Sequence, residues 1–283
     1  PPPRHQRLCL LRLRQVGMSD VKQAAVSSQL SSNSLARPVK HVANAEGAIT
    51  VVKSADELSF YFGALEELAT AATDSNPLFE ASALLAAMRH LAPAGAVHVA
   101  FVWDEIDGGR VLIGAFPFQA RRFYLGLPVV VWSLWIHIHS FIATPLLRSG
   151  HERKALGEFL SLASRSGAPL IRLPLFEADG AFNAALTEVI AGNTLPYVET
   201  SRHERAFLKS DLDGEAYLSA HMRKKKRKEY NRLWNRLAEL GELEFSTHHG
   251  GCDLTGWLDE FLRLEAAGWK GKRGTALAER AEE

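Results

Sequence analysis

"AVHVAFVWDEIDGGRVLIGAFPFQARR" (residues 96–122) predicts a β-hairpin. Its two arms are rich in β-branched and aromatic residues, and they flank the pentapeptide "EIDGG" (105–109). An Asp-Gly pair between two such runs favours a tight hairpin turn. Helical patterns precede and follow the hairpin. We therefore expect an α/β (α+β) fold in which helices flank a mixed central sheet.

Helix and strand signals continue on both sides of the hairpin. Upstream, Ser54 and Glu57 form an S-x-x-E capping box at the start of a predicted helix. A second helix is expected after the turn at Asn76-Pro77. Downstream, the patterns predict strands within 129–138, 168–176, 196–210 and 242–248, and helices over 151–167, 179–192, 213–221, 223–241 and 253–269.

The order of these elements predicts three parts. Residues 1–50 form a disordered or linker-like segment, because Ser, Ala, Asn and Gln dominate most of it without periodicity. Residues 51–210 form an α/β domain, and residues 211–283 begin a second one. The strand at 242–248 cannot bury both of its faces alone, so we expect this second domain to be incomplete.

The N-terminal residues leave two alternatives open. Met18 is a candidate start, which would make residues 1–17 an upstream extension. The other alternative is a targeting peptide, but its apolar part "LCLLRL" (8–13) is short and contains Arg12.

Composition excludes several classes of protein. A hydrophobic content of 47%, with 23% charged residues and a net charge of +1, is typical of a globular protein and not of a polycation. Cys9 and Cys252 are too few for a disulfide framework or a Cys-based metal site, which favours a cytoplasmic protein. The apolar stretch 125–147 contains Pro128 and Pro145, so we expect two buried strands there and no transmembrane segment.

A basic amphipathic helix is the first candidate binding site. An apolar stripe at helical spacing contains Tyr230, Leu233, Trp234, Leu237 and Leu240. The basic residues around it are Arg223, Lys224, Lys225, Lys226, Arg227, Lys228, Arg232 and Arg236. Such density repels itself, which favours a phosphate-bearing partner, although a solvated helix face remains an alternative. Nucleic acid is the less favoured partner, because aromatic residues do not alternate with the basic ones.

A glycine-spaced basic turn is the second candidate. Its residues are Gly268, Trp269, Lys270, Gly271, Lys272, Arg273, Gly274 and Thr275. Glycines let backbone N–H groups turn toward an anion, and we expect Thr275 to cap a helix whose dipole would add to the attraction. An ordinary turn is the alternative. Glu260 and Glu265 lie in the preceding helix, where either could act as a base or serve solubility alone.

Metal and nucleophile motifs are weak or missing in the sequence. His137 and His139 would share one face of a strand, but no Cys or carboxylate near them in sequence completes a metal shell. His248 and His249 would face opposite ways. We find no G-x-S-x-G, H-E-x-x-H or Walker sequence, and we expect no metal ion.

The C-terminal residues resemble a known family. "FLRLEAAGWKGKRGTAL" (261–277) resembles GNAT-type acyltransferases of the CelD-like group, which are associated with bacterial cellulose or exopolysaccharide synthesis. The preceding "RKKKRKEYNRLWNRLAELGELEF" (223–245) is similar to the basic helix of that family. Weaker similarities are "SNPLFEASALLAAM" (75–88), "LIGAFPF" (112–118) and "TPLL" (144–147).

The resemblance implies two GNAT-like domains in tandem, as in FemAB-type transferases, with the second one incomplete after residue 283. It implies an acyl-CoA donor such as acetyl-CoA, an amine or hydroxyl acceptor, and direct attack without a covalent nucleophile. The family's [Q/R]-x-x-G-x-[G/A] donor loop would follow Glu283, because "RVLIGA" (110–115) reads as strand. The fragment alone would then be inactive.

The two candidate sites supply the residues for this function and for its alternatives. The candidate cofactor- or substrate-binding residues are Lys270, Gly271, Lys272, Arg273, Gly274 and Thr275, and the candidate anion-binding residues are Arg223, Lys224, Lys225, Lys226 and Arg227. One alternative is a non-enzymatic module whose helix 223–236 binds RNA or an anionic membrane surface. The other is an inactive structural partner in a polysaccharide assembly.

Overall fold

The structure is a computed structural model that describes residues 4–12, 48–206, 208–244 and 254–279, with the backbone alone for 4–12. The chain divides into two compact units between Ala206 and Phe207, four residues before the boundary that the sequence suggested. The two units are treated separately below.

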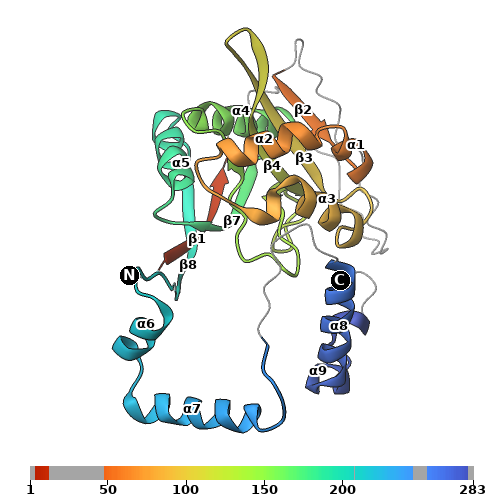
Figure 1. Cartoon of the computed structure of the whole chain (residues 1–283). Helices are drawn as coiled ribbons and strands as arrows, with labels where there is room; N and C mark the ends of the chain where they lie inside the picture. The colour runs from red at the N-terminus through yellow and green to blue at the C-terminus, as the bar shows by residue number, and fades with distance from the viewer. Residues whose placement is uncertain (1–3, 13–47, 207, 245–253, 280–283) are drawn as a thin grey trace. The chain divides into compact units, whose positions relative to one another are not determined.

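An eight-stranded mixed sheet forms the first unit (Figure 1). Its strands are β1 (Arg4–Arg12), β2 (Ile49–Val52), β3 (His98–Ile106), β4 (Gly109–Arg121), β5 (Val131–Leu134), β6 (Leu146–Leu147), β7 (Leu170–Glu177) and β8 (Tyr197–Arg205). Their order across the sheet is β2-β3-β4-β5-β7-β1-β8, and β6 also pairs with β4. Five helices and a 3₁₀ turn accompany this sheet: α1 (Ala55–Ser59), α2 (Phe62–Ala71), η1 (Pro77–Phe79), α3 (Ala81–His90), α4 (Glu152–Arg165) and α5 (Ala181–Gly192).

The predicted hairpin is confirmed. Strands β3 and β4 pair in an antiparallel ladder that closes at Asp107 and Gly108. Both turn residues have positive φ, 51° and 77° respectively, as a tight primed turn requires. The string "RVLIGA" (110–115) lies within β4, as expected.

One pair of strands differs in direction from all the other pairs described. β5 and β7 run parallel, from Val131 opposite Leu170 to Ser133 opposite Arg172. Helix α4 lies in the crossover between them, because parallel neighbours cannot be joined by a tight turn. From β5 the chain continues into β6, which pairs with β4. On its other side, β7 pairs with β1.

Strand β1 was not predicted. Residues 4–12 pair antiparallel with β7 on one side and with β8 on the other, whereas the sequence suggested that residues 1–50 are linker-like. Charged residues interrupt its short apolar run, and its two neighbours follow more than 150 residues later, so no local pattern revealed the strand. Residues 13–47 lie outside the described part of the chain.

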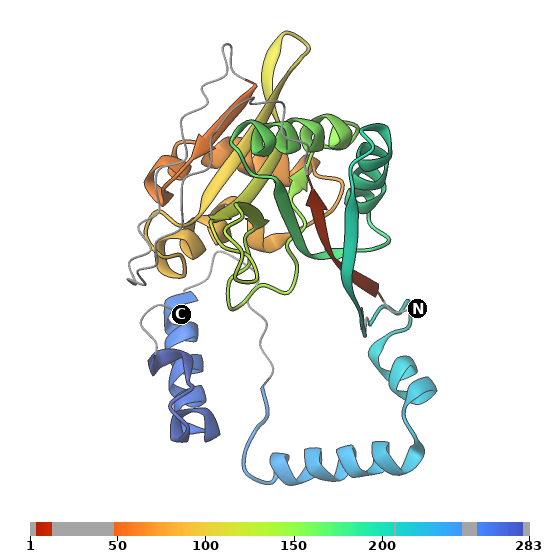
Figure 2. The same cartoon turned by 180° about the vertical axis from the view of Figure 1, so that it is seen from behind.

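Helices cover both faces of the sheet, with α1–α3 on one face and α4 and α5 on the other (Figures 1 and 2). The core consequently has two parts. Val99 and Phe101 of β3 pack with the α1–α3 layer, whereas Ala100 and Val102 pack with α4 and α5. A strand buried on both faces has few polar positions, which explains why the hairpin sequence is almost continuously apolar.

Aromatic stacking fills the core beneath α4. The rings of Phe116 and Phe159 are nearly parallel, with centroids 4.3 Å apart. Phe118 stacks on Trp132 at 4.1 Å. All four side chains are buried, so the β4, β5 and α4 elements are held together by ring contacts as well as by the burial of apolar area.

The helices near the start of this unit depart from the prediction in one detail. The single helix expected from Ser54 is divided into α1 and α2, and the break falls at Phe60 and Tyr61. The Ser54 hydroxyl accepts a hydrogen bond from the Glu57 N–H at 3.1 Å, as expected for a cap. The Glu57 carboxylate accepts from the N–H of Lys53, and not from that of Ser54 as a full capping box would require.

All the regular secondary structure described in the second unit is helical. It contains α6 (Gly214–His221), α7 (Lys224–Ala238), α8 (Leu254–Ala267), α9 (Trp269–Lys272) and the 3₁₀ turn η2 (Leu277–Glu279). Over 208–244 and 254–279 no strand occurs, and no residue of α6–α9 is buried. The strand expected over 242–248 is irregular at 242–244, and the rest of it lies outside the described residues.

The predicted fold class is confirmed by the first unit, a mixed sheet flanked by helices. The helices of the second unit leave most of their large apolar residues exposed in the described ranges.

We expect Phe159→Ala to lower the free energy of unfolding by about 3–5 kcal/mol, because it removes a buried ring that stacks on Phe116. Urea denaturation followed by tryptophan fluorescence would measure this change, since Trp132 lies beside Phe159. Phe60→Ala is the matched control: its ring is 85% exposed, so we expect a change of about 0.5 kcal/mol or less. Equal effects of the two substitutions would contradict this description of the core.

Candidate functional site

Helix α7 carries the predicted anion-binding residues. Arg223 precedes the helix, and Lys224, Lys225, Lys226 and Arg227 occupy its beginning. In the described part of the chain, none of these side chains takes part in an ion pair. The Lys226 ammonium lies 5.6 Å from the centre of the Tyr230 ring, at a distance typical of a cation–π contact.

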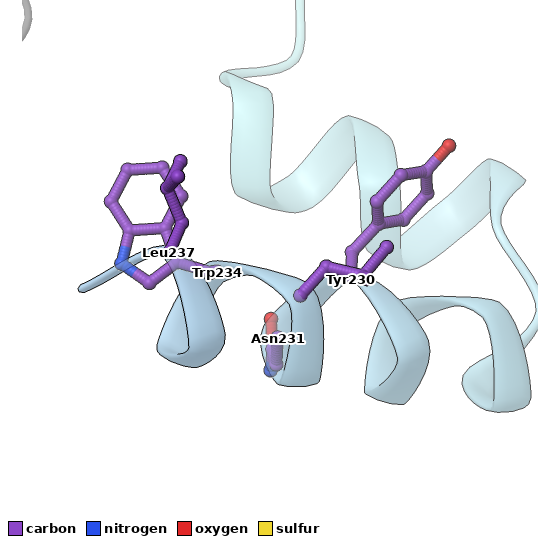
Figure 3. Close-up of a pocket in the computed structure, with 5 residues that line it drawn as sticks. Tyr230, Asn231, Trp234 and Leu237 are labelled. Carbon is purple, nitrogen blue, oxygen red and sulfur yellow. The ribbon is translucent and has the colours of Figure 1, made fainter. Parts of the chain in front are cut away.

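An apolar face follows the basic residues along α7. Tyr230, Leu233, Trp234 and Leu237 recur at helical spacing, and each is about half exposed. Figure 3 shows Tyr230, Trp234 and Leu237 along the same side of the helix. Together with Asn231 they line a shallow hollow of about 320 Å³. Helix α7 therefore presents a cationic end and an apolar end.

The basic turn after α8 is itself helical. Trp269–Lys272 forms α9, and the N–H of Thr275 donates to the carbonyl of Lys270 at 3.0 Å. The Thr275 hydroxyl also donates to the Lys270 carbonyl. Up to Glu279, where the description of this segment ends, Thr275 thus caps no helix, so that expectation is wrong. In place of the expected helix, the described residues form the short 3₁₀ turn η2.

An internal carboxylate occupies the place where an anion was expected to bind. The Glu265 side chain is 8% exposed and forms an ion pair with Lys270. Its second carboxylate oxygen accepts a hydrogen bond from the N–H of Leu277 at 2.9 Å. The Lys270 ammonium and the backbone N–H that follows the turn at Leu277 therefore both bind Glu265. Arg273 lies over the Trp269 ring at 5.2 Å.

The turn's glycines have structural reasons to be there. A Cβ on Gly271 would overlap the carbonyl oxygen of Ala266 in α8, so only glycine allows α9 to pack this closely. Gly274 has φ +65°, which glycine adopts without strain. These geometric needs account for the two positions without an anionic ligand.

Glu260 and Glu265, both considered as possible bases, differ in their surroundings. Glu260 forms an exposed i,i+3 ion pair with Arg263. The pKa of the Glu265 carboxyl is lowered, mainly by its hydrogen bond from Lys270 and also by the Leu277 N–H. Both therefore stay ionised near neutral pH. Side chains five residues apart do not face each other on one helix, so the i,i+5 spacing of Glu265 and Lys270 did not predict this ion pair.

The histidine pair was expected on a strand, and the structure contradicts this. His137 and His139 follow β5 in a loop, where the backbone N–H of His139 donates to Nδ1 of His137 at 3.3 Å. Burial, followed by the nearby His139, lowers the pKa of His137 and so favours its neutral form. In the described ranges, no three His, Cys, Asp or Glu side chains converge as a metal ion would require. His248 and His249 lie outside them.

The loop before α4 is a feature that the sequence reading missed. Glu152 accepts hydrogen bonds from the Thr73 hydroxyl and from the N–H of Gly150. Partial burial alone would raise the pKa of Glu152, but these hydrogen bonds outweigh it and the pKa is lowered. An Asp or Glu in the first turn of a helix is the local sequence signal that could have suggested these hydrogen bonds.

A second carboxylate acts in the same way at α5. Asp74 accepts from the N–H groups of Ala181 and Phe182, at 3.2 and 2.7 Å. Near α4, Asp104 contacts both Lys154 and His151, and its pKa is lowered chiefly by the hydrogen bond from Lys154. Glu152 and Asp74 thus accept hydrogen bonds at the starts of α4 and α5, and Asp104 joins β3 to α4 through Lys154.

Comparison with known proteins adds no assignment: the sequence matches no protein-family model, and no curated protein matches it. None of the helices in the described ranges has both the length and the apolar character needed to cross a bilayer.

We expect Gly271→Ala to displace α9 from α8, because the added methyl group overlaps the Ala266 carbonyl. Hydrogen–deuterium exchange of peptides covering 270–279 should become faster. Gly214→Ala is the control, since no atom lies within 4 Å of the added carbon at that position. Unchanged exchange in Gly271→Ala would show that α9 is not packed as described.

We expect the Glu265 carboxyl to titrate below the ordinary glutamate range of about 4.3, because its pKa is lowered. The hydrogen bond from the Leu277 N–H to Glu265 should be fully formed at pH values above the ordinary glutamate range, and it should be lost as the pH falls through the lowered pKa of Glu265. Carboxyl ¹³C shifts would report the midpoint. Lys270→Met should raise it, and Lys272→Met should leave it unchanged; a midpoint insensitive to Lys270 would exclude the ion pair.

Proposed function

We propose that this chain acts in acyl transfer, as a GNAT-type N-acyltransferase that uses acetyl-CoA or another acyl-CoA. The observation that carries the proposal is the single parallel pair β5–β7 joined through α4, within a sheet whose other described pairs are antiparallel. A mixed sheet of this kind fits the resemblance of residues 221–277 to the CelD-like group. Polysaccharide biosynthesis in the cytoplasm, where acyl-CoA is available, is the proposed setting.

The proposed reaction needs no nucleophilic residue on the enzyme. An acceptor amine or hydroxyl attacks the thioester carbonyl, a C–N or C–O bond forms, and the C–S bond breaks. Coenzyme A leaves as the thiol after taking up the proton that the acceptor loses. Positioning of the two substrates and hydrogen bonds to the developing oxyanion provide the rate enhancement in such a reaction.

The first unit serves in this proposal as a supporting domain. A donor pyrophosphate would need free N–H groups in a loop between a strand and a helix. The loop from Arg148 to His151 has that position, between β6 and α4. Glu152 accepts the Gly150 N–H there and adds a negative charge that would repel phosphate.

The donor is therefore assigned to the second unit. Lys270 is neutralised by Glu265, so Lys272 and Arg273 are the cations of the turn that remain for donor phosphates. Both side chains are exposed. In this proposal the turn contributes charge at the edge of a donor site and not a cradle of backbone N–H groups.

Calorimetric titration with acetyl-CoA at low ionic strength tests the proposal, on this chain and, where the reading frame continues past Glu283, on the longer polypeptide. We expect binding that weakens about tenfold in the double variant Lys272→Gln/Arg273→Gln, because phosphate contacts are lost. The matched control Arg121→Gln/Arg122→Gln removes two exposed arginines of the first unit and should bind normally.

Absence of acetyl-CoA binding in both polypeptides would reject the acyltransferase proposal. Normal binding by the Lys272→Gln/Arg273→Gln variant would reject the assignment of the donor to the turn and keep the activity.

A further inference from the structure

The strongest unassigned feature of the molecule is the surface of α7, defined here as residues 223–238. It contains eight basic residues and a single acidic one, Glu229. No acidic residue lies in the first turn, where the helix dipole favours negative charge. Like charges spaced three or four residues apart also repel one another. The charge arrangement is therefore unfavourable for the isolated helix.

The two kinds of residue share one face. Arg223, Lys226 and Arg227 precede Tyr230 at intervals of seven, four and three residues, which places them on the side that carries the apolar residues. Leu233 and Leu237, among others, continue that face toward the C-terminal end. One side of α7 thus changes from cationic to apolar along its length.

The apolar half of this face is open in the second unit. Leu233, Leu237 and Tyr230 are 47%, 49% and 50% exposed, respectively. Aliphatic side chains gain nothing from exposure, since their transfer out of water is favourable. A partner that covers the face must therefore provide both negative charge and an apolar medium.

We propose that α7 docks on an anionic lipid surface. Lipid phosphates and serine carboxylates would neutralise the basic end, and the acyl-chain boundary would take up Leu233, Leu237 and the aromatic rings. Tyr230 and Trp234 are suited to the interface, because each combines an apolar ring with a polar group. Nucleic acid would neutralise the charge but leave the two leucines in water, so the observations favour lipid.

Sedimentation with vesicles tests this docking. The whole chain should bind phosphatidylcholine vesicles that contain phosphatidylserine, bind pure phosphatidylcholine vesicles much less, and dissociate as salt is added. Lys224→Gln/Lys225→Gln/Lys226→Gln should weaken binding about 100-fold, because each lost cation removes part of the surface attraction.

A matched pair of apolar variants separates docking from plain charge attraction. Leu233→Ala/Leu237→Ala should weaken vesicle binding about tenfold, because two side chains no longer enter the interface. Leu254→Ala/Leu264→Ala is the control, since it removes two similarly exposed leucines from α8. Far-ultraviolet circular dichroism of each variant checks that helix content is kept.

Three outcomes would overturn the docking proposal. The first is that the chain does not bind phosphatidylserine-containing vesicles at low ionic strength. The second is that the two double-leucine variants weaken vesicle binding equally. The third is that the chain binds RNA more tightly than it binds anionic vesicles when the two compete for it. Acetyl-CoA titration of the same variants keeps the two proposals distinguishable, because α7 is assigned no role in donor binding.

Discussion

Burial of both faces of the β3–β4 hairpin is the constraint on which the first unit depends. Strands β3 and β4 contribute alternate side chains to two separate parts of the core, one under α1–α3 and one under α4 and α5. Neither helical layer can be omitted without exposing a row of apolar residues. Helix α4, which covers one of these faces, lies in the crossover between β5 and β7. Because the chain crosses over in this way, β5 and β7 run parallel.

Carboxylates of the protein itself accept hydrogen bonds from backbone N–H groups at the starts of several helices. Asp74 accepts from N–H groups at the start of α5, Glu152 accepts at the start of α4, and Glu265 accepts at the start of η2. Each satisfies a backbone donor that would otherwise be left to solvent or ligand. In the described ranges, the cationic surface of α7 differs because its basic side chains form no ion pair.

Local patterns predicted the hairpin, β5, β7, β8 and the positions of most helices, because each of these elements carries its own periodicity or turn signal. The sequence did not predict β1, whose pairing with β7 and β8 depends on residues far along the chain. It also did not predict the contacts that determine the structure of the glycine-spaced turn. Gly271 is set by the approach of the Ala266 carbonyl, and Lys270 by Glu265, contacts that arise only once α9 folds back on α8.

Strand β1 ties the amino-terminal segment to β8, the strand at the edge of the sheet. In the described part of the sheet, β8 hydrogen-bonds to β1 alone, and β8 is the last strand before the chain enters the second unit. Tension on the connection after Arg205 would therefore be carried through the β1–β8 ladder into the rest of the sheet. A polypeptide that began at Met18 would lack this tether, and its β8 backbone would lose the pairing that now anchors it.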